Sequence, residues 1–453
     1  MSQMEIMGKI FDHIEGQKEL YESWLYRICE QRSISATDDG VAECAVLVAD
    51  LCEEVGLSVE WVETPRHPVL VARMKGRSKY TLGFYDHYDV QPVDPIEEWD
   101  SEPFVPALRG DRLYARGVAD NKGNFISRLA AIEAWIAVVG EIPVNVCFIL
   151  DGAEEIGSPG LNSVAEYLEE TVDIDGLIWE SGSLNAAGEL VSYEGVKGIV
   201  SIELTAVADR DDLHSMYATV VSNPAWRLTG ALSSFWDEGG RISIPGFFAG
   251  TRAETEIDHE ELARYCRNEA ESLRDLGART DLEDFELVRQ HVFGATLNLS
   301  GMTTGYVGPG SKSVLPAKAT ARLDARLIPD QDPDNVVEAI REHLQRGGYH
   351  DIEIRVLGNV PPFRSVEGTR LSSAVRAAAA EIYTGYIVYP TLAAAGPMHA
   401  LCAKRGIPAS AAPGTADHLS AFHAPNESIQ MVNFYKAIRG IALVLENLGS
   451  EAS

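Results

Sequence analysis

The stretch TLGFYDHYDVQP, residues 81–92, places a run of apolar residues directly before a run of polar ones. The apolar half predicts a buried strand, and Asp with Pro in the polar half is typical of a chain leaving a sheet. Taken alone, Tyr85 to Pro92 is most simply an ordinary strand exit with a solvated His87, because most isolated His-x-Asp triplets bind nothing. A chemical role for these residues depends on what lies at the ends of the neighbouring strands.

Apolar runs alternate with helical periodicity on both sides of this stretch. Strands that are apolar throughout and interleaved with helices are typical of a buried, mostly parallel sheet flanked by helices. The sequence therefore predicts an α/β fold for this part of the chain. The expected strands are 68–74, 81–85, 144–152 and 175–180, and the expected helices are 4–30, 42–55, 120–139 and 161–170.

The pattern changes near residue 198. Alternating strands and amphipathic helices follow, and strand–helix alternation with apolar strands then returns near residue 363. We therefore expect a catalytic α/β domain, residues 1–198 and 363–453, interrupted by an inserted α+β lid and dimerisation domain, residues 199–362. The later expected elements are strands at 200–208, 295–301 and 319–328 and helices at 334–346, 371–383 and 431–448.

Composition limits the classes of partner. The chain has 453 residues, and its 68 acidic and 38 basic residues give a formal charge of −30, which argues against nucleic acid. No basic leader followed by an apolar run opens the sequence, and no segment approaches the length of a membrane span, so we expect a cytoplasmic protein without a membrane partner. The six cysteines show no CxxC spacing and are expected to be reduced thiols.

Polar residues gather where the predicted strands end. Glu154 and Glu155 follow one strand, Glu180 ends another, and Asp120 begins a helix. Ligands of open α/β sheets bind outside the carboxyl ends of the strands. Four carboxylates and His87 with no Lys or Arg run beside them would repel each other, and a divalent metal is the simplest compensation. Histidine and carboxylate are the usual donors to zinc when no thiolate is available.

Each of these residues also has a simpler interpretation. A Glu-Glu pair is usually a solvated helix face, and Asp120 alone is most simply a helix N-cap. These interpretations do not explain why such residues recur at consecutive strand ends. Two divalent ions carry four positive charges, and Asp120, Glu155 and Glu180 carry three negative charges. Such a site would retain one positive charge and hold a hydroxide.

Four motifs in order resemble the di-zinc peptidases and deacylases of peptidase family M20. They are HYDVQP (87–92), ARGVADNKG (115–123), FILDGAEEIGS (148–158) and HAPNE (423–427). This family includes carnosinase-type dipeptidases, acetylornithine deacetylase, succinyl-diaminopimelate desuccinylase, aminoacylase and carboxypeptidase G. The resemblance covers nearly the whole chain. It implies a homodimeric, binuclear metal-dependent hydrolase that cleaves the amide bond of a small carboxylate-bearing substrate, with zinc favoured and manganese or cobalt as alternatives.

The resemblance also implies a role for each site residue. Asp120 would bridge both ions, Glu154 would be the general base that takes a proton as hydroxide attacks the amide, and Asp89 would hold the imidazole of His87. His418 is the rival of His423 for the last ligand position. The residues that match the family's metal ligands are His87, Asp120, Glu155, Glu180 and His423.

The inserted domain adds two candidates. DDLHSMY resembles the segment from which a histidine reaches into the partner subunit's site, which would make His214 an oxyanion donor in trans. The glycines that usually flank that histidine are missing, so a surface histidine is the alternative. Arg326 matches an arginine that grips the substrate carboxylate in the dipeptidase branch, a role that suits its bidentate fork. Arg322, on the same strand face, is a candidate salt-bridge residue.

One departure from the family pattern bears on the substrate. Where dipeptidases carry a Glu-Gly-Gly-Ser-type loop, this chain reads AAAGPMHAL, with Gly396 before Pro397. The loop, which we expect to line the specificity pocket, has lost an acid and a hydroxyl. An N-acyl amino acid, or an unusual aromatic or non-peptide amide, therefore becomes an alternative to a dipeptide. A non-catalytic binding relative is a third hypothesis, against which the retention of Glu154 and all five ligand positions argues.

Overall fold

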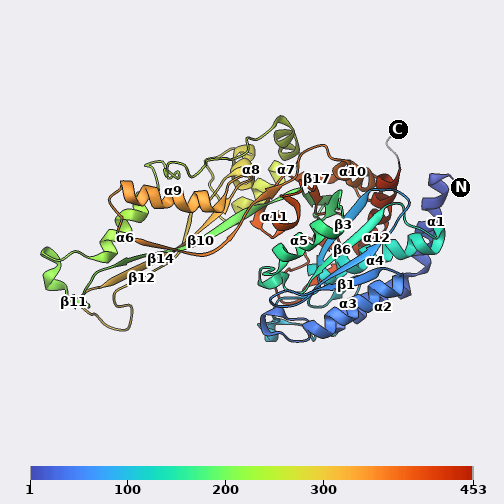
Figure 1. The fold of residues 1–453 in the computed structure, drawn as a ribbon, viewed down its shortest axis with the longest axis horizontal. Helices are drawn as coiled ribbons and strands as arrows, with labels where there is room; N and C mark the ends of the chain where they lie inside the picture. Colours follow the sequence, from blue (N-terminus) through green and yellow to red (C-terminus); the bar gives the residue numbers. More distant parts are fainter. Residues whose placement is uncertain (1, 451–453) are drawn as a thin grey trace. The chain divides into compact units, whose positions relative to one another are not determined.

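The computed structural model describes residues 2–450 and divides into two compact units (Figure 1). Unit 1 consists of Met1–Gly195, Arg364–Pro390 and Ala400–Ser453, and unit 2 consists of Val196–Phe363 and Thr391–His399. Thr391–His399 contains the AAAGPMH loop, so this loop packs with the inserted segment, although it lies far from that segment in sequence.

The central sheet of unit 1 has the strand order β1–β2–β6–β3–β7–β19. Strand β3 pairs in parallel with both β6 and β7, and β7 pairs in parallel with β19, whereas β1 and β2 add antiparallel at one edge. This confirms the predicted α/β fold with a mostly parallel sheet. The strands are β1 (Ser58–Val62), β2 (Val69–Met74), β3 (Thr81–His87), β6 (Asn145–Asp151), β7 (Gly176–Ile178) and β19 (Ala409–Ser410).

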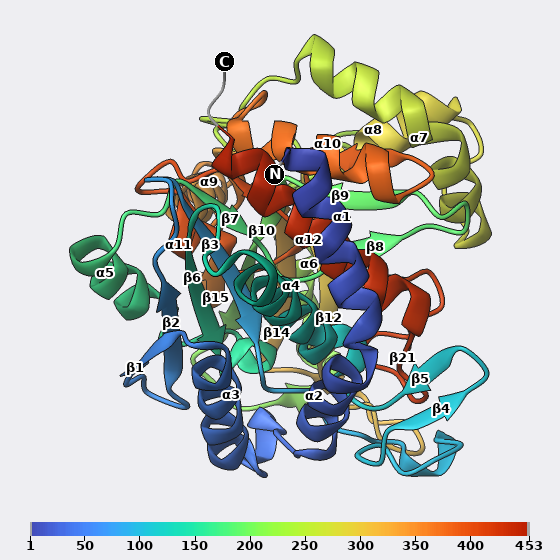
Figure 2. The same cartoon turned by 90° about the vertical axis from the view of Figure 1, so that its right-hand side faces the viewer.

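Helices cover this sheet. In Figure 2, α4 lies between strands β3 and β6 on one side and helices α1 and α12 on the other. The predicted helix 4–30 divides at Gln17, which ends α1 and begins α2. The helices of unit 1 are α1 (Gln3–Gly16), α2 (Lys18–Glu30), α3 (Val41–Val55), α4 (Gly123–Val139), α5 (Leu161–Thr171), α10 (Arg370–Ile382), α11 (Met398–Cys402, which begins in unit 2) and α12 (Met431–Gly449).

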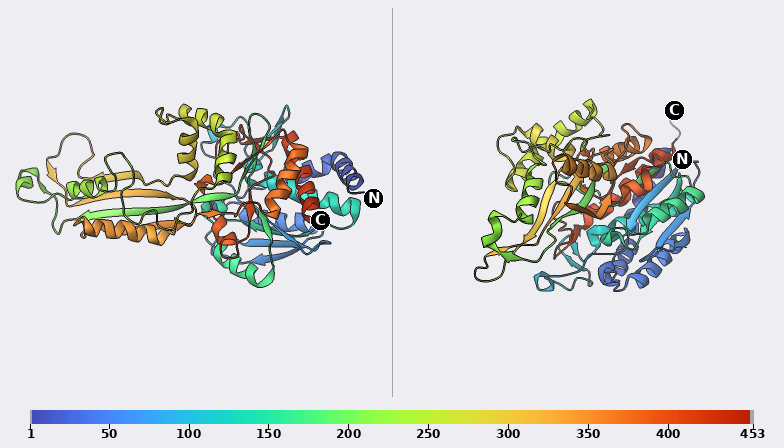
Figure 3. Two further views of the ribbon diagram at one scale, coloured as in Figure 1. Left: turned by 90° about the horizontal axis from the view of Figure 1, so that it is seen from above. Right: turned by 60° about the vertical axis from the view of Figure 1, so that its left-hand side comes forward.

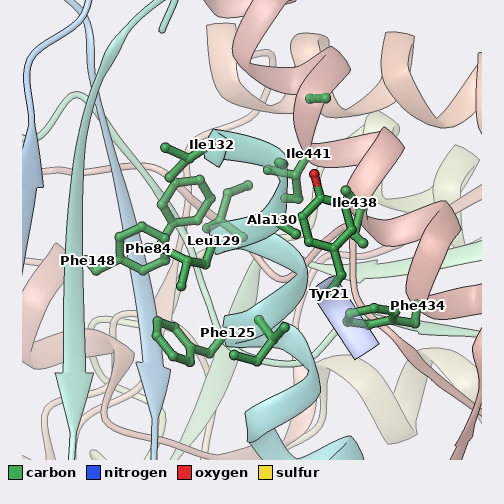
Figure 4. Packing of buried hydrophobic residues seen from close by; sticks show 14 of the residues in the cluster. Tyr21, Phe84, Phe125, Leu129, Ala130, Ile132, Phe148, Phe434, Ile438 and Ile441 are labelled. Atoms are coloured by element: carbon green, nitrogen blue, oxygen red, sulfur yellow. The ribbon is translucent and has the colours of Figure 1, made fainter. Parts of the chain in front are cut away.

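Helix α4 is apolar on nearly every side because it is buried between two layers. Figure 4 shows Phe125 of α4 beside Phe84 of β3 and Phe148 of β6. The rings of Phe84 and Phe148 stack with centroids 4.8 Å apart, and Phe125 meets Phe148 edge-on at 5.9 Å. Full burial of one such ring contributes about 1.5–3 kcal/mol. This packing holds rigidly the strands at whose ends the candidate site lies.

Two smaller sheets complete unit 1. One has the order β17–β9–β8–β20 and the other β21–β5–β4. All six cysteines lie in the described part of the chain and are unpaired, as predicted. The strands are β4 (Ala107–Arg109), β5 (Arg112–Tyr114), β8 (Ser183–Leu184), β9 (Leu190–Tyr193), β17 (Tyr386–Tyr389), β20 (Ala416–Asp417) and β21 (Ser428–Gln430).

Unit 2 is built on an antiparallel sheet with the order β12–β14–β10–β15. Alternate residues of β14 and of the middle of β10 are buried, because α6 and α9 cover one face of the sheet. Figure 3 shows α9 lying along these strands. The elements are β10 (Gly195–Val207), β12 (Asn298–Thr304), β14 (Lys318–Leu327), β15 (Glu353–Val360), α6 (Pro224–Ser233), α7 (Glu256–Asp275), α8 (Asp284–Phe293) and α9 (Pro333–Arg346).

Further short strands lie outside this main path. Strand β18 (Leu392–Ala395) runs parallel to the beginning of β10, and β11 (Leu213–His214) pairs with β13 (Val314–Leu315). Within residues 2–450, no helix is long and apolar enough to cross a membrane.

Candidate metal centre

Three strand ends of unit 1 meet at one edge of the sheet. His87 is the last residue of β3 and pairs with Asp151, the last residue of β6. Glu154 and Glu155 follow in the short helix η4 (Glu154–Ile156), and Glu180 comes two residues after β7. Parallel strands end at the same edge, so the sheet topology alone brings these side chains together.

Asp120 reaches the same edge from the turn before α4. It lies in η3 (Val118–Lys122), a π-helical turn, with the non-helical backbone angles φ −128° and ψ 87°. The N-cap position of α4 is Lys122, so Asp120 does not cap this helix. The simpler interpretation of Asp120 as an N-cap is therefore wrong, and its side chain is free for another role.

The two oxygens of Asp120 face two different histidines. Oδ1 lies 2.9 Å from Nε2 of His87, and Oδ2 lies 3.1 Å from Nε2 of His423. Nε2 of His87 is also 3.6 Å from Oε2 of Glu180, and Nε2 of His423 is 3.3 Å from Oε2 of Glu155. The result is two groups of a histidine and a glutamate that share one aspartate.

These spacings suit two metal ions. Ligand atoms held about 2.0–2.2 Å from a tetrahedral ion lie roughly 3.3–3.6 Å from each other, close to the observed separations. One candidate group also includes the general-base candidate, since ligand atoms of His87, Glu154 and Glu180 lie within 4.8 Å of one another. Ligand atoms of His87, Asp120 and Glu155 meet the same limit.

The carboxylates of the site are partly buried without a matching cation. Burial raises the pKa of Glu180 well above its usual range, and burial raises the pKa of Glu154 to about 8, with the charges of Glu155 and Asp120 adding to the effect. Within residues 2–450, no Lys or Arg forms an ion pair with these four carboxylates. Oε2 of Glu180 is a buried oxygen with no hydrogen-bond partner in the described chain.

The histidines respond to the same excess of negative charge. Hydrogen bonds to Asp120 and Glu155 raise the pKa of His423 to about 10. Burial alone would lower the pKa of His87, but Asp120, Asp89 and Glu180 together raise it well above its usual range. A bound cation would neutralise the carboxylates in place of the protons on His423 and His87. The donor set, the orphaned oxygen of Glu180 and the spacings therefore fit two divalent ions, one held by His87, Asp120 and Glu180 and the other by His423, Asp120 and Glu155.

Asp89 positions other residues of the site through hydrogen bonds. Its carboxylate oxygens accept hydrogen bonds from the backbone N–H groups of Glu154 and Glu155, both at 3.1 Å. Nδ1 of His87 lies 3.0 Å from the backbone oxygen of Asp89 and 3.4 Å from its Oδ1. Asp89 therefore orients the ring mainly through its backbone, whereas its side chain fixes the Glu-Glu pair.

Two further polar contacts escaped the sequence analysis. Nε2 of Gln91 donates to Oε2 of Glu155 at 2.8 Å, and Nε1 of Trp179 donates to Oε1 of Glu180 at 3.1 Å. Trp179 thereby leaves Oε2 of Glu180, the oxygen that faces His87, for a metal. Gln91 holds the same oxygen of Glu155 that faces His423. Gln91 lies in the HYDVQP motif and Trp179 directly precedes Glu180, so their proximity to predicted ligands was the available signal.

His423, rather than its rival His418, contacts Asp120. The segment that carries it has an unusual backbone, because Ala421, His423 and Asn426 have φ values of 54°, 59° and 62°. Left-handed conformations at residues other than glycine are costly and persist only where surrounding contacts fix them.

The remaining candidates belong to unit 2. His214 is exposed, and its Nδ1 accepts a hydrogen bond from the backbone N–H of Met216 at 3.1 Å. Nε of Arg322 donates to Oε2 of Glu203 at 3.0 Å, as expected of a salt-bridge residue. Arg326 is half-buried on β14, and Gly396 is half-buried directly after β18.

Comparisons with known proteins agree with this geometry. A family model described as peptidase family M20/M25/M40 matches residues 83–447. The crystal structure of the M20 family metallo-carboxypeptidase Sso-CP2 from Sulfolobus solfataricus is 36% identical, with a TM-score of 0.86 over 95% of this chain and 99% of that one.

Two fungal relatives are also similar in sequence. The Cys-Gly metallodipeptidase dug1 of Schizosaccharomyces pombe is 27% identical over 75% of this chain and 76% of its own length. The probable di- and tripeptidase DUG2 of Saccharomyces cerevisiae is 27% identical over 72% of this chain, but the match spans only 36% of that longer protein. The matched family model covers most of the chain, so the protein belongs to peptidase family M20/M25/M40 and is a metal-dependent hydrolase.

Proposed function

We propose that the protein is a binuclear metallohydrolase that cleaves the amide bond of a small substrate with a free carboxylate, such as a dipeptide. The observation that carries this proposal is the position of Asp120, whose two oxygens each face a separate His–Glu pair. The relatives named as a Cys-Gly metallodipeptidase and a metallo-carboxypeptidase support peptide substrates.

Glu154 is the general base of this proposal. Two divalent ions would polarise the substrate carbonyl and lower the pKa of the attacking water. Ligand atoms of Glu154, His87 and Glu180 lie within 4.8 Å of one another, so Glu154 would be close enough to accept a proton from that water and pass it to the leaving nitrogen. Asp89 holds the backbone of Glu154 in place, while Gln91 and Trp179 orient the ligands Glu155 and Glu180.

Arg326 would bind the substrate carboxylate. It lies opposite Ile199 on β10, and no ion pair of its guanidinium is present within residues 2–450. The buried Lys197, two residues from Ile199, faces the same side of the sheet and donates to the backbone oxygens of His291 and Gly294, both at 2.7 Å. Burial and the charge of Arg326 lower the pKa of Lys197 to about 8. Two neighbouring cations with no carboxylate between them favour an anionic ligand.

A homodimer is the second part of the proposal, with residues 199–362 as the lid and dimerisation domain. Large apolar side chains close to His214 in sequence are exposed, among them Met216 at 64%, Val220 at 82% and Trp226 at 76%. Exposed apolar residues gathered in one segment are typical of a protein–protein interface. Because Nδ1 of His214 accepts a hydrogen bond, its neutral ring carries the proton on Nε2. We propose that this N–H stabilises the oxyanion in the partner subunit's site.

The N-acyl amino acid deacylase remains a second candidate, which one observation favours. Residues 392–397 read LAAAGP and offer neither an acid nor a hydroxyl to hold a free amino group. Aromatic and other non-peptide amides with a carboxylate fit this loop for the same reason.

One experiment tests both candidates. The metal content of the purified protein is measured, and hydrolysis is assayed on dipeptides, the matching N-acyl amino acids and C-terminally amidated dipeptides. We expect about two divalent ions per chain, loss of activity on chelation and restoration by zinc, manganese or cobalt. Cleavage of the amidated substrates should be roughly 10- to 100-fold slower. Full activity in metal-free protein would contradict the mechanism, and metal binding without hydrolysis of any substrate would favour a non-catalytic relative.

A further inference from the structure

Glu427, the last residue of the HAPNE motif, is a carboxylate with no role in the proposed chemistry. Its side chain is 1% exposed. Oε2 accepts hydrogen bonds from Nη1 of Arg116 at 2.9 Å and from the N–H of Gly117 at 2.8 Å. Oε1 accepts from the N–H of Ala119 at 2.8 Å and from the N–H of Asp120 at 3.0 Å.

These bonds all go to the segment that carries Asp120. Three of the four donors are backbone N–H groups of that segment, which gather around the carboxylate as such groups do around a bound anion. The backbone N–H of Asp120 itself is one of them. Glu427 therefore fixes the backbone of the aspartate whose side chain joins the two halves of the site.

Glu427 also fixes the segment that carries His423, four residues earlier in the chain. The backbone oxygen of Glu427 accepts from the N–H of Ala115 at 3.1 Å, and the pairing continues as β21 joins β5. Next to it, Asn426 accepts from the N–H of Asp100 at 2.9 Å and donates to the oxygen of Glu98 at 3.0 Å. These contacts hold Asn426, one of the left-handed residues of the segment that carries His423.

We infer that Glu427 is a positioning residue that sets the placement of Asp120 relative to His423, and thereby the affinity for the ion that these residues share with Glu155. The inference rests on the proposed metal centre. Residues that orient metal ligands through hydrogen bonds typically change metal affinity by 10- to 100-fold when they are substituted. The substitution Glu427→Gln keeps the size of the side chain but turns an N–H donor toward the N–H groups of the cradle.

Asp417 provides a matched control. It is a buried carboxylate that accepts from Nη2 of Arg112 at 2.7 and 2.6 Å and from the N–H of Leu419 at 2.8 Å. It contacts none of the candidate metal ligands through these bonds. Asp417→Asn therefore removes a comparable buried ion pair from the same part of unit 1 without touching the Asp120 segment.

The test titrates Co²⁺ into the metal-free full-length protein against a competing chelator and records the visible spectrum, which reports coordination geometry, and the Tm. We expect Glu427→Gln to weaken one of two Co²⁺ sites by roughly 10- to 100-fold and to change its spectrum, and Asp417→Asn to bind both ions like wild type despite a similar loss of Tm. Wild-type affinity and spectrum in Glu427→Gln, or equal weakening in both variants, would overturn the inference.

Arg116→Met covers the case in which Glu427→Gln does not fold. It removes one partner of Glu427 and leaves the three backbone bonds, so we expect a smaller loss of affinity at the same site. Unchanged Co²⁺ binding in a folded Arg116→Met would then contradict the inference. Failure of the proposed metal centre itself is distinguishable, because the wild type would then not bind two ions.

Discussion

The candidate residues of unit 1 and those of unit 2 differ in how completely the protein satisfies them. In unit 1, Asp120, Glu155 and Glu180 are held by hydrogen bonds from other side chains, and what they lack is positive charge. In unit 2, His214 is exposed and Arg326 has no acidic partner in the described chain. The difference agrees with the proposal that unit 1 binds small cations, whereas the residues of unit 2 meet another molecule.

Substitution of the proposed general base, Glu154, is the sharpest test of the roles proposed for the unit 1 residues. Glu154→Gln cannot accept a proton, so we expect turnover to fall by roughly 100- to 10,000-fold with metal content unchanged. Glu155→Gln instead removes charge from an oxygen 3.3 Å from Nε2 of His423, and it should lower the occupancy of one ion. Steady-state kinetics and metal analysis of both variants check this. Loss of metal in Glu154→Gln with full occupancy in Glu155→Gln would reverse the assignment within the pair.

His214 tests whether unit 2 meets a second copy of the chain. His214→Ala should reduce turnover by roughly 100- to 1,000-fold, as loss of an oxyanion donor does. Mixing it with Glu154→Gln by joint unfolding and refolding with metal should restore about a quarter of wild-type activity, since about half of the dimers are hybrids with one intact site of two.

The complementation has its own control. A histidine that serves its own subunit cannot be rescued, because every site then contains one defect. No recovery in a sample shown to contain hybrid dimers would mean that His214 acts in cis or is a surface residue.

Arg326 and Arg322 make a matched pair on one strand face. Arg322 is already neutralised by Glu203, so Arg322→Met should change kcat/KM by less than about twofold. Arg326→Met should lower kcat/KM for a carboxylate substrate by roughly 10- to 100-fold, mainly through KM, because a hydrogen bond to a charged group contributes about 1.5–3 kcal/mol. With a C-terminally amidated substrate, Arg322→Met and Arg326→Met should have the same kcat/KM. A larger loss of kcat/KM in Arg322→Met than in Arg326→Met would show that Arg322 binds the substrate carboxylate.

The fold was predictable where periodicity was strong. The apolar stretch before Asp86 became β3, buried along its whole length, and the helix predicted at 431–448 is Met431–Gly449. The division of the first helix at Gln17 was missed because both halves have the same periodicity. The packing of Thr391–His399 with unit 2 was also missed, since a tertiary contact between distant segments leaves no local pattern.

The candidate site was predictable in its residues more than in its contacts. His87, Glu154 and Glu180 come together because parallel strands end at one edge, which the strand pattern itself implies. The hydrogen bonds of Glu427 could not be predicted, because they join segments about 300 residues apart and go mostly to backbone N–H groups that any sequence carries. The order of the motifs placed Glu427 near the site but gave no partner for it.

Gly396 gives the smallest and most selective effect. A Cβ added there would meet no atom within 4 Å, so the fold itself does not require glycine at this position. Gly396→Leu should therefore leave the Tm unchanged and alter KM by roughly 2- to 10-fold, by a factor that depends on the substrate side chain, if this loop lines the specificity pocket. Gly358→Leu is the control, because Gly358 of β15 in the same unit is equally open. Measured on dipeptides and N-acyl amino acids, a shift in preference limited to Gly396→Leu would place this loop at the substrate. Unchanged kinetics would remove Gly396 from the substrate-binding residues and leave Arg326 as the candidate of unit 2 that contacts the substrate in cis.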